Sequence, residues 1–173
     1  MRLIYPPLIS KKSIKQRVCE LAQDVCRRTN PELLHVIVVL KGAMFFAADL
    51  LRELPPVTSV EFIRASSYQG TNSIGKLEIS DFSINEVKQK QVLLIEDVFD
   101  TGLTINHIYH NLQQQEPDSL DLCVLLEKKK QRKGVNVSPA FVGFYIEDNF
   151  VVGYGMDYDG KFRNLPDIHI LEI

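Results

Sequence analysis

The sequence lacks the features that would place it in a membrane or attract it to nucleic acid. No apolar run approaches the roughly 20 residues that a membrane-spanning helix requires. The first twelve residues have neither the apolar core nor the small-residue cleavage site of a secretory signal. Neither sign of charge is in excess, because the formal net charge is only −2. Such a surface exerts no general pull on nucleic acid or an anionic membrane, so we expect neither as a partner.

Cysteine is also scarce, and its spacing gives no C-x-x-C pair. The chain has an odd number of cysteines, Cys19, Cys26 and Cys123, each among apolar neighbours. This pattern favours buried free thiols over a disulfide framework. Because free thiols are typical of a reducing compartment, we expect the protein in the cytoplasm.

Apolar strands alternate with amphipathic helices along the chain. A length of 173 residues fits one domain, 1–173, with a sizeable core. The expected strands are 34–40, 57–63, 92–95, 120–126 and 141–146, with an antiparallel strand at 77–82, and the expected helices are 10–28, 42–54 and 103–115. The alternation predicts an α/β fold with a mostly parallel central sheet flanked by helices, followed by irregular segments from 147 to 173. Ligands of such sheets bind beyond the carboxyl ends of the strands.

The segment VLLIEDVFDTGLTI, residues 92–105, crosses such a strand end. Gly102 permits a tight backbone curl, after which the N–H groups of residues 101–104 and two threonine hydroxyls can point at an anion. The spacing fits neither the phosphate loop G-x-x-x-x-G-K-[ST] nor the dinucleotide motif G-x-G-x-x-G. A plain helix start, capped by Asp100 or Thr101, explains the Asp-Thr-Gly-x-Thr part equally well.

Two neighbouring acids favour the ligand interpretation. Glu96 and Asp97 leave the apolar strand together, and this placement costs stability unless a ligand uses them. Carboxylates accept hydrogen bonds, whereas the two hydroxyls of a sugar diol donate them. A ligand that carries a ribose beside a phosphate would therefore fit both halves of the segment.

The whole segment resembles the phosphoribosyl-diphosphate motif of the type I phosphoribosyltransferases: four apolar residues, Glu-Asp, two apolar residues and Asp-Thr-Gly-x-Thr. The resemblance covers essentially the whole chain and implies this family's fold, with a small hood formed from the chain termini. It implies that Glu96 and Asp97 face the ribose hydroxyls and that Asp100 is catalytic, holding the proton of the purine N7. The residues implied to hold the 5′-phosphate are Thr101, Gly102, Leu103 and Thr104, while Asp100 points at the incoming base.

Two further turns resemble one branch of this family, the hypoxanthine–guanine phosphoribosyltransferases. Lys41-Gly42 after the first strand is by itself a solvated helix start, but it resembles the branch's diphosphate loop. The resemblance implies a non-proline cis peptide at Leu40–Lys41. Ser67-Tyr68 resembles the Ser-Tyr of a mobile loop, here 65–76, that closes over the active site, and a plain polar loop is the alternative.

Lys128 opens a basic run at residues 128–133. From composition alone, the run indicates a solvated face, with a weak attraction for nucleic acid as the second interpretation. The resemblance implies that Lys128 donates a hydrogen bond to the purine O6. Such a donor would reject adenine, whose 6-amino group cannot accept it.

The segment FVVGYGMDYDGKFRNLP, residues 150–166, could by itself be an irregular packed tail. It resembles the family's C-terminal segment nearly residue for residue. The resemblance implies that Phe150 stacks on the purine and that the Val151 backbone reads the base edge. It also implies that Asp157 binds near the purine and holds magnesium. Arg163 would contact the diphosphate through its fork of donors.

The sequence therefore leads to the hypothesis of a Mg²⁺-dependent hypoxanthine or guanine phosphoribosyltransferase of purine salvage. Its substrates would be phosphoribosyl diphosphate and a 6-oxopurine, and the expected metal ligands are Glu96, Asp97 and Asp157. The family implies a homodimer or homotetramer. Two alternatives stay open: a sister transferase that prefers xanthine or another base, and an RNA-binding regulator on the same fold.

Overall fold

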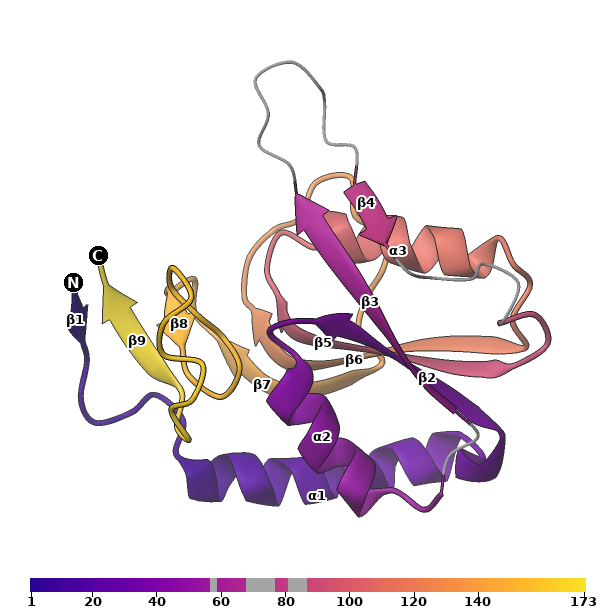
Figure 1. Cartoon of the computed structure of the whole chain (residues 1–173), viewed down its shortest axis with the longest axis horizontal. Helices are drawn as coiled ribbons and strands as arrows, with labels where there is room; N and C mark the ends of the chain where they lie inside the picture. The colour runs from indigo at the N-terminus through magenta and orange to yellow at the C-terminus, as the bar shows by residue number, and fades with distance from the viewer. Residues whose placement is uncertain (57–58, 68–76, 81–86) are drawn as a thin grey trace.

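The computed structural model describes residues 1–56, 59–67, 77–80 and 87–173. A large sheet forms its centre, and a small sheet gathers both ends of the chain beside it (Figure 1). In the small sheet, β9 (His169–Glu172) lies between β1 (Arg2–Leu3) and β8 (Val151–Val152), antiparallel to both. This sheet is the hood that the family resemblance implied. It corrects the expectation of an irregular C-terminal tail, because strands of two to four residues are too short to leave a periodic pattern.

The large sheet has the order β4-β3-β2-β5-β6-β7. Its strands are β2 (Leu34–Leu40), β3 (Ser59–Ser67), β4 (Leu77–Ser80), β5 (Gln91–Phe99), β6 (Ser119–Lys128) and β7 (Phe141–Ile146). Five of them are mutually parallel, and β4 pairs antiparallel with the edge of β3. The expected α/β class, with an antiparallel strand near residues 77–82, is therefore confirmed.

Helices cover both faces of this sheet (Figure 1). α1 (Lys11–Arg28) and α2 (Met44–Glu53) pack on one face, α3 (Leu103–Gln113) lies on the other, and a short 3₁₀ turn spans Pro31–Leu33. The side chains of β2 alternate between two apolar clusters: Val36 and Val38 join one, and Ile37 and Val39 join the other. Burial on both faces explains why this strand is apolar throughout. None of the described helices is long and apolar enough to cross a membrane.

The expected ends of β5 and β6 were too early, because main-chain pairing continues beyond the apolar residues. β5 extends to Phe99, with Glu96 opposite Val124 of β6. Glu96 and Asp97 are therefore strand residues and do not follow the strand. Lys128 is likewise the last residue of β6 and has a register partner in β7.

The polar residues after Ile63 also continue a strand. β3 extends to Ser67 because β4 supplies an antiparallel partner there, with Ser67 opposite Leu77. Residues 65–67, which were expected in a loop, are therefore strand residues. Residues 68–76, including the predicted loop residue Tyr68, lie outside the described part of the chain.

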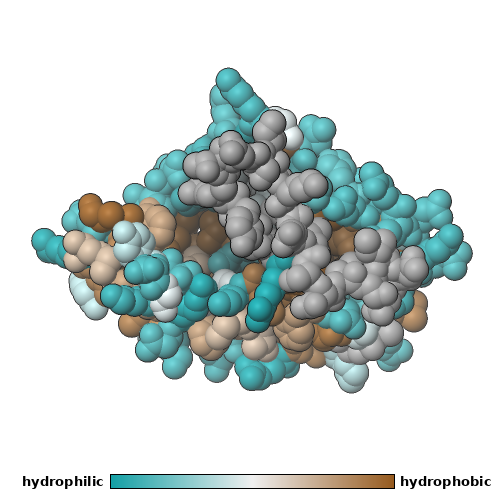
Figure 2. All heavy atoms as spheres, turned by 45° about the horizontal axis from the view of Figure 1, so that its top comes forward, coloured by the Kyte–Doolittle hydropathy of each residue, from teal (hydrophilic) through white to brown (hydrophobic). Residues whose placement is uncertain are grey.

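All three cysteines are free thiols, but only Cys123 is fully buried. Cys19 and Cys26 lie on α1 and are partly exposed, so the expectation of three buried thiols is only partly right. On the face seen in Figure 2, hydrophilic residues form most of the outline, and hydrophobic residues show mainly at the left end and lower edge. Large apolar side chains that remain exposed include Met44 and Phe45 at the start of α2.

The chain changes direction across the sheet between β2 and β5. β2 is followed in sequence by β3 on one side, whereas β5 is followed by β6 on the other. The connections that leave the carboxyl ends of β2 and β5 therefore diverge, and open a crevice between them. The loop after β2, at Lys41 and Gly42, faces the end of β5 across this crevice.

A substitution at Leu93 tests how much the larger apolar cluster contributes to stability, because Leu93 is fully buried in the middle of β5. Leu93→Ala should lower the free energy of unfolding by about 2–5 kcal/mol through lost contacts and a residual cavity. Leu33→Ala is the control, since Leu33 is 57% exposed and should change stability by no more than about 0.5 kcal/mol. Urea unfolding followed by circular dichroism gives both values. Equal stability of the two variants would contradict this account of the core.

Candidate active site

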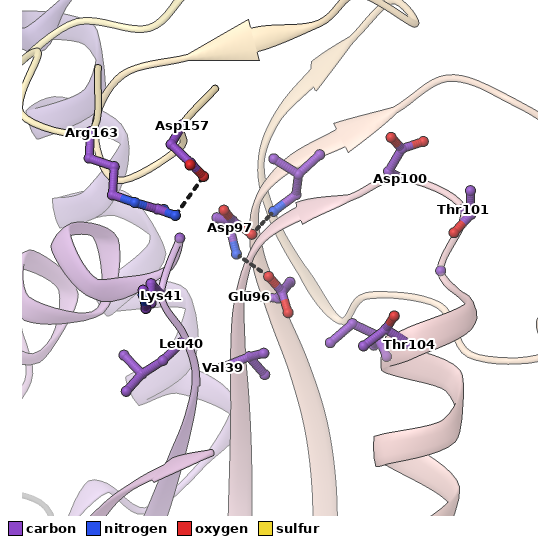
Figure 3. A pocket seen from close by; sticks show the side chains of 14 residues that line it. Val39, Leu40, Lys41, Glu96, Asp97, Asp100, Thr101, Thr104, Asp157 and Arg163 are labelled. Atoms are coloured by element: carbon purple, nitrogen blue, oxygen red, sulfur yellow. Dashed lines mark hydrogen bonds and ion pairs between the residues drawn. The ribbon is translucent and has the colours of Figure 1, made fainter. Parts of the chain in front are cut away.

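A cavity of about 330 Å³ lies at the divergence of β2 and β5, and we call it the switch-point cavity (Figure 3). Its walls come from the ends of both strands, the start of α3 and the segment between β8 and β9. Its lining residues are Val39, Leu40, Lys41, Gly42, Glu96, Asp97, Val98, Asp100, Thr101, Gly102, Thr104, Ile105, Asp157 and Arg163. The set includes every residue predicted for the ribose, phosphate and diphosphate except Leu103. The Leu103 side chain is 60% exposed and does not line the cavity.

The end of β2 approaches the end of β5 very closely. The Leu40–Lys41 peptide is cis, as the family resemblance implied. A Cβ atom at Gly42 would collide with the Asp97 carboxylate. Position 42 therefore has to be glycine if Asp97 is to keep its place.

The start of α3 carries no side-chain cap. Its N-cap is Gly102, in the left-handed region at φ 73°, so the alternative of a helix start capped by Asp100 or Thr101 is wrong. Phe99 packs behind the glycine, where a Cβ atom would lie 2.9 Å from the ring. The first N–H groups of a helix have no partner within it and favour an anion. Thr101 and Thr104 line the cavity beside them.

Glu96 and Asp97 form the floor between these two ends. The Glu96 Oε1 accepts a hydrogen bond from the Asp97 N–H at 3.1 Å, and Asp97 Oδ1 accepts one from the Val98 N–H at 2.8 Å. Desolvation by burial raises the pKa of Glu96 well above its usual range, and the neighbouring charge of Asp97 raises it further. The raised pKa shifts Glu96 toward the neutral form, which can donate as well as accept a hydrogen bond.

A second cavity of about 190 Å³ shares Asp97, Val98, Asp100 and Asp157 with the first, and we call it the adjoining cavity. Its other lining residues are Lys128, Phe150, Val151 and Met156. All four residues predicted to bind the purine thus meet in one place, although they come from different elements. Met156 is 4% exposed and was not predicted; its apolar side chain gave no signal beyond that of a core residue.

Lys128 is the buried cation of the adjoining cavity, with 8% of its surface exposed. Its Nζ donates to Asp100 Oδ2 and to Asp148 Oδ1, each at 3.0 Å. Lys130 pairs with the same two carboxylates. Burial raises the pKa of Asp100, but hydrogen bonds from Lys130 and Lys128 outweigh this effect and leave the pKa below its usual value. Asp100 is therefore ionised at neutral pH.

The segment between β8 and β9 closes the switch-point cavity. Arg163 Nη1 donates to the Gly155 carbonyl at 2.6 Å, and its Nη2 pairs with Asp157 Oδ1 at 2.5 Å (Figure 3). Asp157 Oδ2 also accepts from the Gly160 N–H at 2.7 Å. A Cβ atom at Gly155 would collide with the carbonyl of Gly42, so this segment rests directly on the loop after β2.

Residues 9–159 match the family model described as the phosphoribosyl transferase domain. The chain belongs to the phosphoribosyltransferase family. The mostly parallel sheet with its helices and hood is the type I phosphoribosyltransferase fold.

Individual relatives match over nearly their whole length. The chain is 40% identical to the hypoxanthine-guanine phosphoribosyltransferase of Aquifex aeolicus, over 95% of this chain and 93% of that protein. It is 38% identical to the hypoxanthine-guanine-xanthine phosphoribosyltransferase of Tritrichomonas foetus, over 95% and 90%. A crystal structure of a hypoxanthine-guanine phosphoribosyltransferase from Bacillus anthracis superposes with a TM-score of 0.88 at 39% identity, covering 98% of this chain and 99% of that one.

Gly42→Ala tests the close approach that shapes the phosphoribosyltransferase site. The new methyl group would displace the end of a flexible side chain, Asp97, and not the backbone. We expect kcat/KM for phosphoribosyl diphosphate to fall by about tenfold or more, equivalent to about 1.4 kcal/mol. Thermal unfolding should stay close to that of the wild type. Wild-type kinetics would show that the Gly42–Asp97 approach is dispensable.

Proposed function

We propose that this phosphoribosyltransferase acts in purine salvage, transferring the 5-phosphoribosyl group from phosphoribosyl diphosphate to N9 of hypoxanthine or guanine. The products would be the nucleotide, IMP or GMP, and diphosphate. The observation that carries the proposal is the adjoining cavity, where Lys128, Phe150, Val151 and Asp157 surround the space next to Asp100. Two relatives are named for activity on the same 6-oxopurines, and these names support the proposal.

The two cavities divide the substrates between them. The 5′-phosphate lies at the start of α3, against residues 101–104, and the ribose hydroxyls face Glu96 and Asp97. The diphosphate lies toward Lys41, Gly42 and Arg163, which line the opposite side of the switch-point cavity. The purine occupies the adjoining cavity, between Phe150 and Lys128.

The reaction exchanges one bond at C1 of the ribose for another. The bond from C1 to the diphosphate oxygen breaks as purine N9 forms its bond on the opposite face, so C1 is inverted. Positive charge develops on the ribose and negative charge on the diphosphate, which Lys41 and Arg163 stabilise. The purine loses one proton, and ionised Asp100 accepts it or holds it at N7.

Lys128 sets the choice of base. Asp100 and Asp148 use two of its three N–H donors, which leaves one for the purine O6. A sister enzyme that prefers xanthine is the second candidate, because one relative is named for hypoxanthine, guanine and xanthine together. The order of preference among these three bases depends on contacts around Val151 and Asp157.

Magnesium fits the carboxylates of the switch-point cavity as an ion that binds together with the substrate. In the described part of the chain, no group of three or more His, Cys, Asp or Glu is arranged to hold a metal. Mg²⁺ usually takes only one or two protein carboxylates and completes its shell with phosphate oxygens and water. Asp97 and Asp157 are suitable, whereas the raised pKa of Glu96 makes it less ready to bind as a carboxylate. The ion would neutralise charge on the leaving diphosphate.

An RNA-binding regulator on the same fold is disfavoured by the charges of the basic run. Lys128 and Lys130 pair with Asp100 and Asp148, while Lys129 pairs with Glu147. Arg132 pairs with Glu127. The phosphate backbone of an RNA would have to compete with these acids for these four cations.

Three broader features complete the proposal. The chain is one phosphoribosyltransferase domain, 1–173, and the predicted active-site loop of 65–76 is confined to the residues after Ser67. It acts in the cytoplasm, which agrees with its three free thiols. It assembles as a homodimer or homotetramer, as the family resemblance implies.

A spectrophotometric assay with phosphoribosyl diphosphate, Mg²⁺ and each purine tests the function and the role of Lys128 together. The wild type should convert hypoxanthine or guanine and not adenine. Lys128→Ala should raise the KM for hypoxanthine by about tenfold or more, because one hydrogen bond from a charged donor is worth about 1.5–3 kcal/mol. Lys133→Ala, at an exposed position of the same basic run, is the matched control. An unchanged KM in Lys128→Ala would remove this lysine from the O6 contact, and a wild type inactive on 6-oxopurines would refute the function.

Asp100→Asn tests the proton-holding role. The variant keeps the shape of the side chain but has no negative charge, so kcat should fall, by up to about 10²-fold. We expect a loss at the lower end of the usual range for proton transfer, because departure of diphosphate dominates the barrier. Pre-steady-state measurement of nucleotide formation separates this step from product release. Full kcat in the variant would show that Asp100 does not handle the proton.

A further inference from the structure

Arg132 is the most extensively bonded side chain near the two cavities, although it lines neither. Its Nε donates to the carbonyl of Asp100 at 2.7 Å. Its Nη2 donates to the carbonyls of Phe99 at 2.8 Å and Lys128 at 2.6 Å, and its Nη1 donates to Glu127 Oε1 at 3.1 Å. Four of the five guanidinium N–H groups therefore have a protein acceptor.

The guanidinium also covers the ring behind the phosphate loop. Its central carbon lies 4.3 Å from the centroid of the Phe99 ring. The same ring packs against Gly102, the N-cap of α3. Arg132 thus contacts the backbone just before the anion-binding turn and the aromatic ring that supports that turn. The attraction between a guanidinium and an aromatic face adds to the hydrogen bonds.

These contacts join the ends of two strands. Phe99 ends β5 and Asp100 follows it, whereas Lys128 ends β6. The β5–β6 ladder ends at Phe99 and Glu127, and the ion pair between the Asp100 and Lys128 side chains cannot by itself fix the backbones of these two residues beyond it. A guanidinium fork bonded to carbonyls on both strands can, because it is planar and presents several donors in fixed directions.

We propose that Arg132 is a positioning residue, which holds the Asp100 turn and the Lys128 strand end at the spacing that the transferred group and the base require. It acts through the backbones of these residues. The role rests on the proposed function, since it concerns the residues assigned to the purine and its proton. Lysine cannot replace Arg132, because an ammonium group cannot bond Asp100, Phe99 and Lys128 from one planar fork.

Arg132→Lys tests this role, with Arg17→Lys as the matched control. Arg17 also donates to two backbone carbonyls, of Val142 and Gly143, and pairs with Glu20, but it lies on α1 against β7 and lines neither cavity. We expect kcat/KM for hypoxanthine to fall by about tenfold or more in Arg132→Lys. Arg17→Lys should keep wild-type kinetics, while thermal unfolding changes by a similar amount in both variants. A loss of activity that only follows the loss of folded protein, in Arg132→Lys and in Arg132→Gln alike, would overturn the proposal.

A double-mutant cycle identifies the path of the effect. In a Lys128→Ala background, Arg132→Lys should cost at least about threefold less in kcat/KM than in the wild type, because the contact it positions is already gone. Independent effects that simply multiply would overturn the role through Lys128.

Amide hydrogen exchange gives a readout that needs no substrate. Residues 99–104 and 128–131 should exchange faster in Arg132→Lys than in Arg17→Lys, since the clamp between the two strand ends is lost. Unchanged exchange in both segments would refute the clamp. If the wild type and Arg17→Lys turn over no purine, the proposed function fails, but exchange still decides whether Arg132 joins these segments.

Discussion

The close approach of the loop after β2 to the end of β5 is the constraint on which the site depends. The cavity at this point exists because the chain leaves these neighbouring strands in opposite directions, so neither connection crosses the space between their ends. Gly42 has no side chain that would displace Asp97, and Gly155 has none that would keep the C-terminal segment away from the Gly42 carbonyl. Three segments far apart in sequence therefore share one cavity. Its opposite walls carry groups suited to opposite ends of a long, multiply charged sugar phosphate.

The acids of this cavity do not make it a uniformly negative site. Asp100 shares Lys128 and Lys130 with Asp148, and Asp157 is paired with Arg163. Glu96 has a raised pKa and favours the uncharged form. The charges of Asp100 and Asp157 are thus compensated locally by cations, and the raised pKa of Glu96 favours its protonation. In the proposed complex, an anionic ligand would meet donors at the start of α3 and near Arg163, while the remaining carboxylate oxygens would face its hydroxyl or proton-bearing parts.

Much of the fold could be predicted because it depends on local pattern, whereas most residues of the candidate site were predicted through the resemblance to a known family. Apolar runs indicated the parallel strands, and the Glu-Asp to Thr-Gly-Leu-Thr segment located the turn after β5. The strand ends were less predictable, since Glu96 and Lys128 are held in strands by pairing with neighbours that the local sequence does not identify. Arg132 was predicted only as one cation of the basic run. Three of its hydrogen-bond acceptors are backbone carbonyls, and these leave no signal in the sequence because every residue has one. Gly102 was not predicted as the N-cap of α3, because the Asp100 side chain accepts a hydrogen bond from Lys128 and does not cap the helix.

The hood has a consequence for how the protein matures on the ribosome. β8, which presents Val151 to the adjoining cavity, is paired with β9, and β9 is paired in turn with β1. β1 must therefore wait for β9, which is translated after the whole central sheet, before the hood can close. The central sheet needs no such delay, since β7 ends at Ile146. Synthesis thus separates the appearance of the turns after β2 and β5 from that of the segment between β8 and β9, and only a chain translated past β9 can close both cavities.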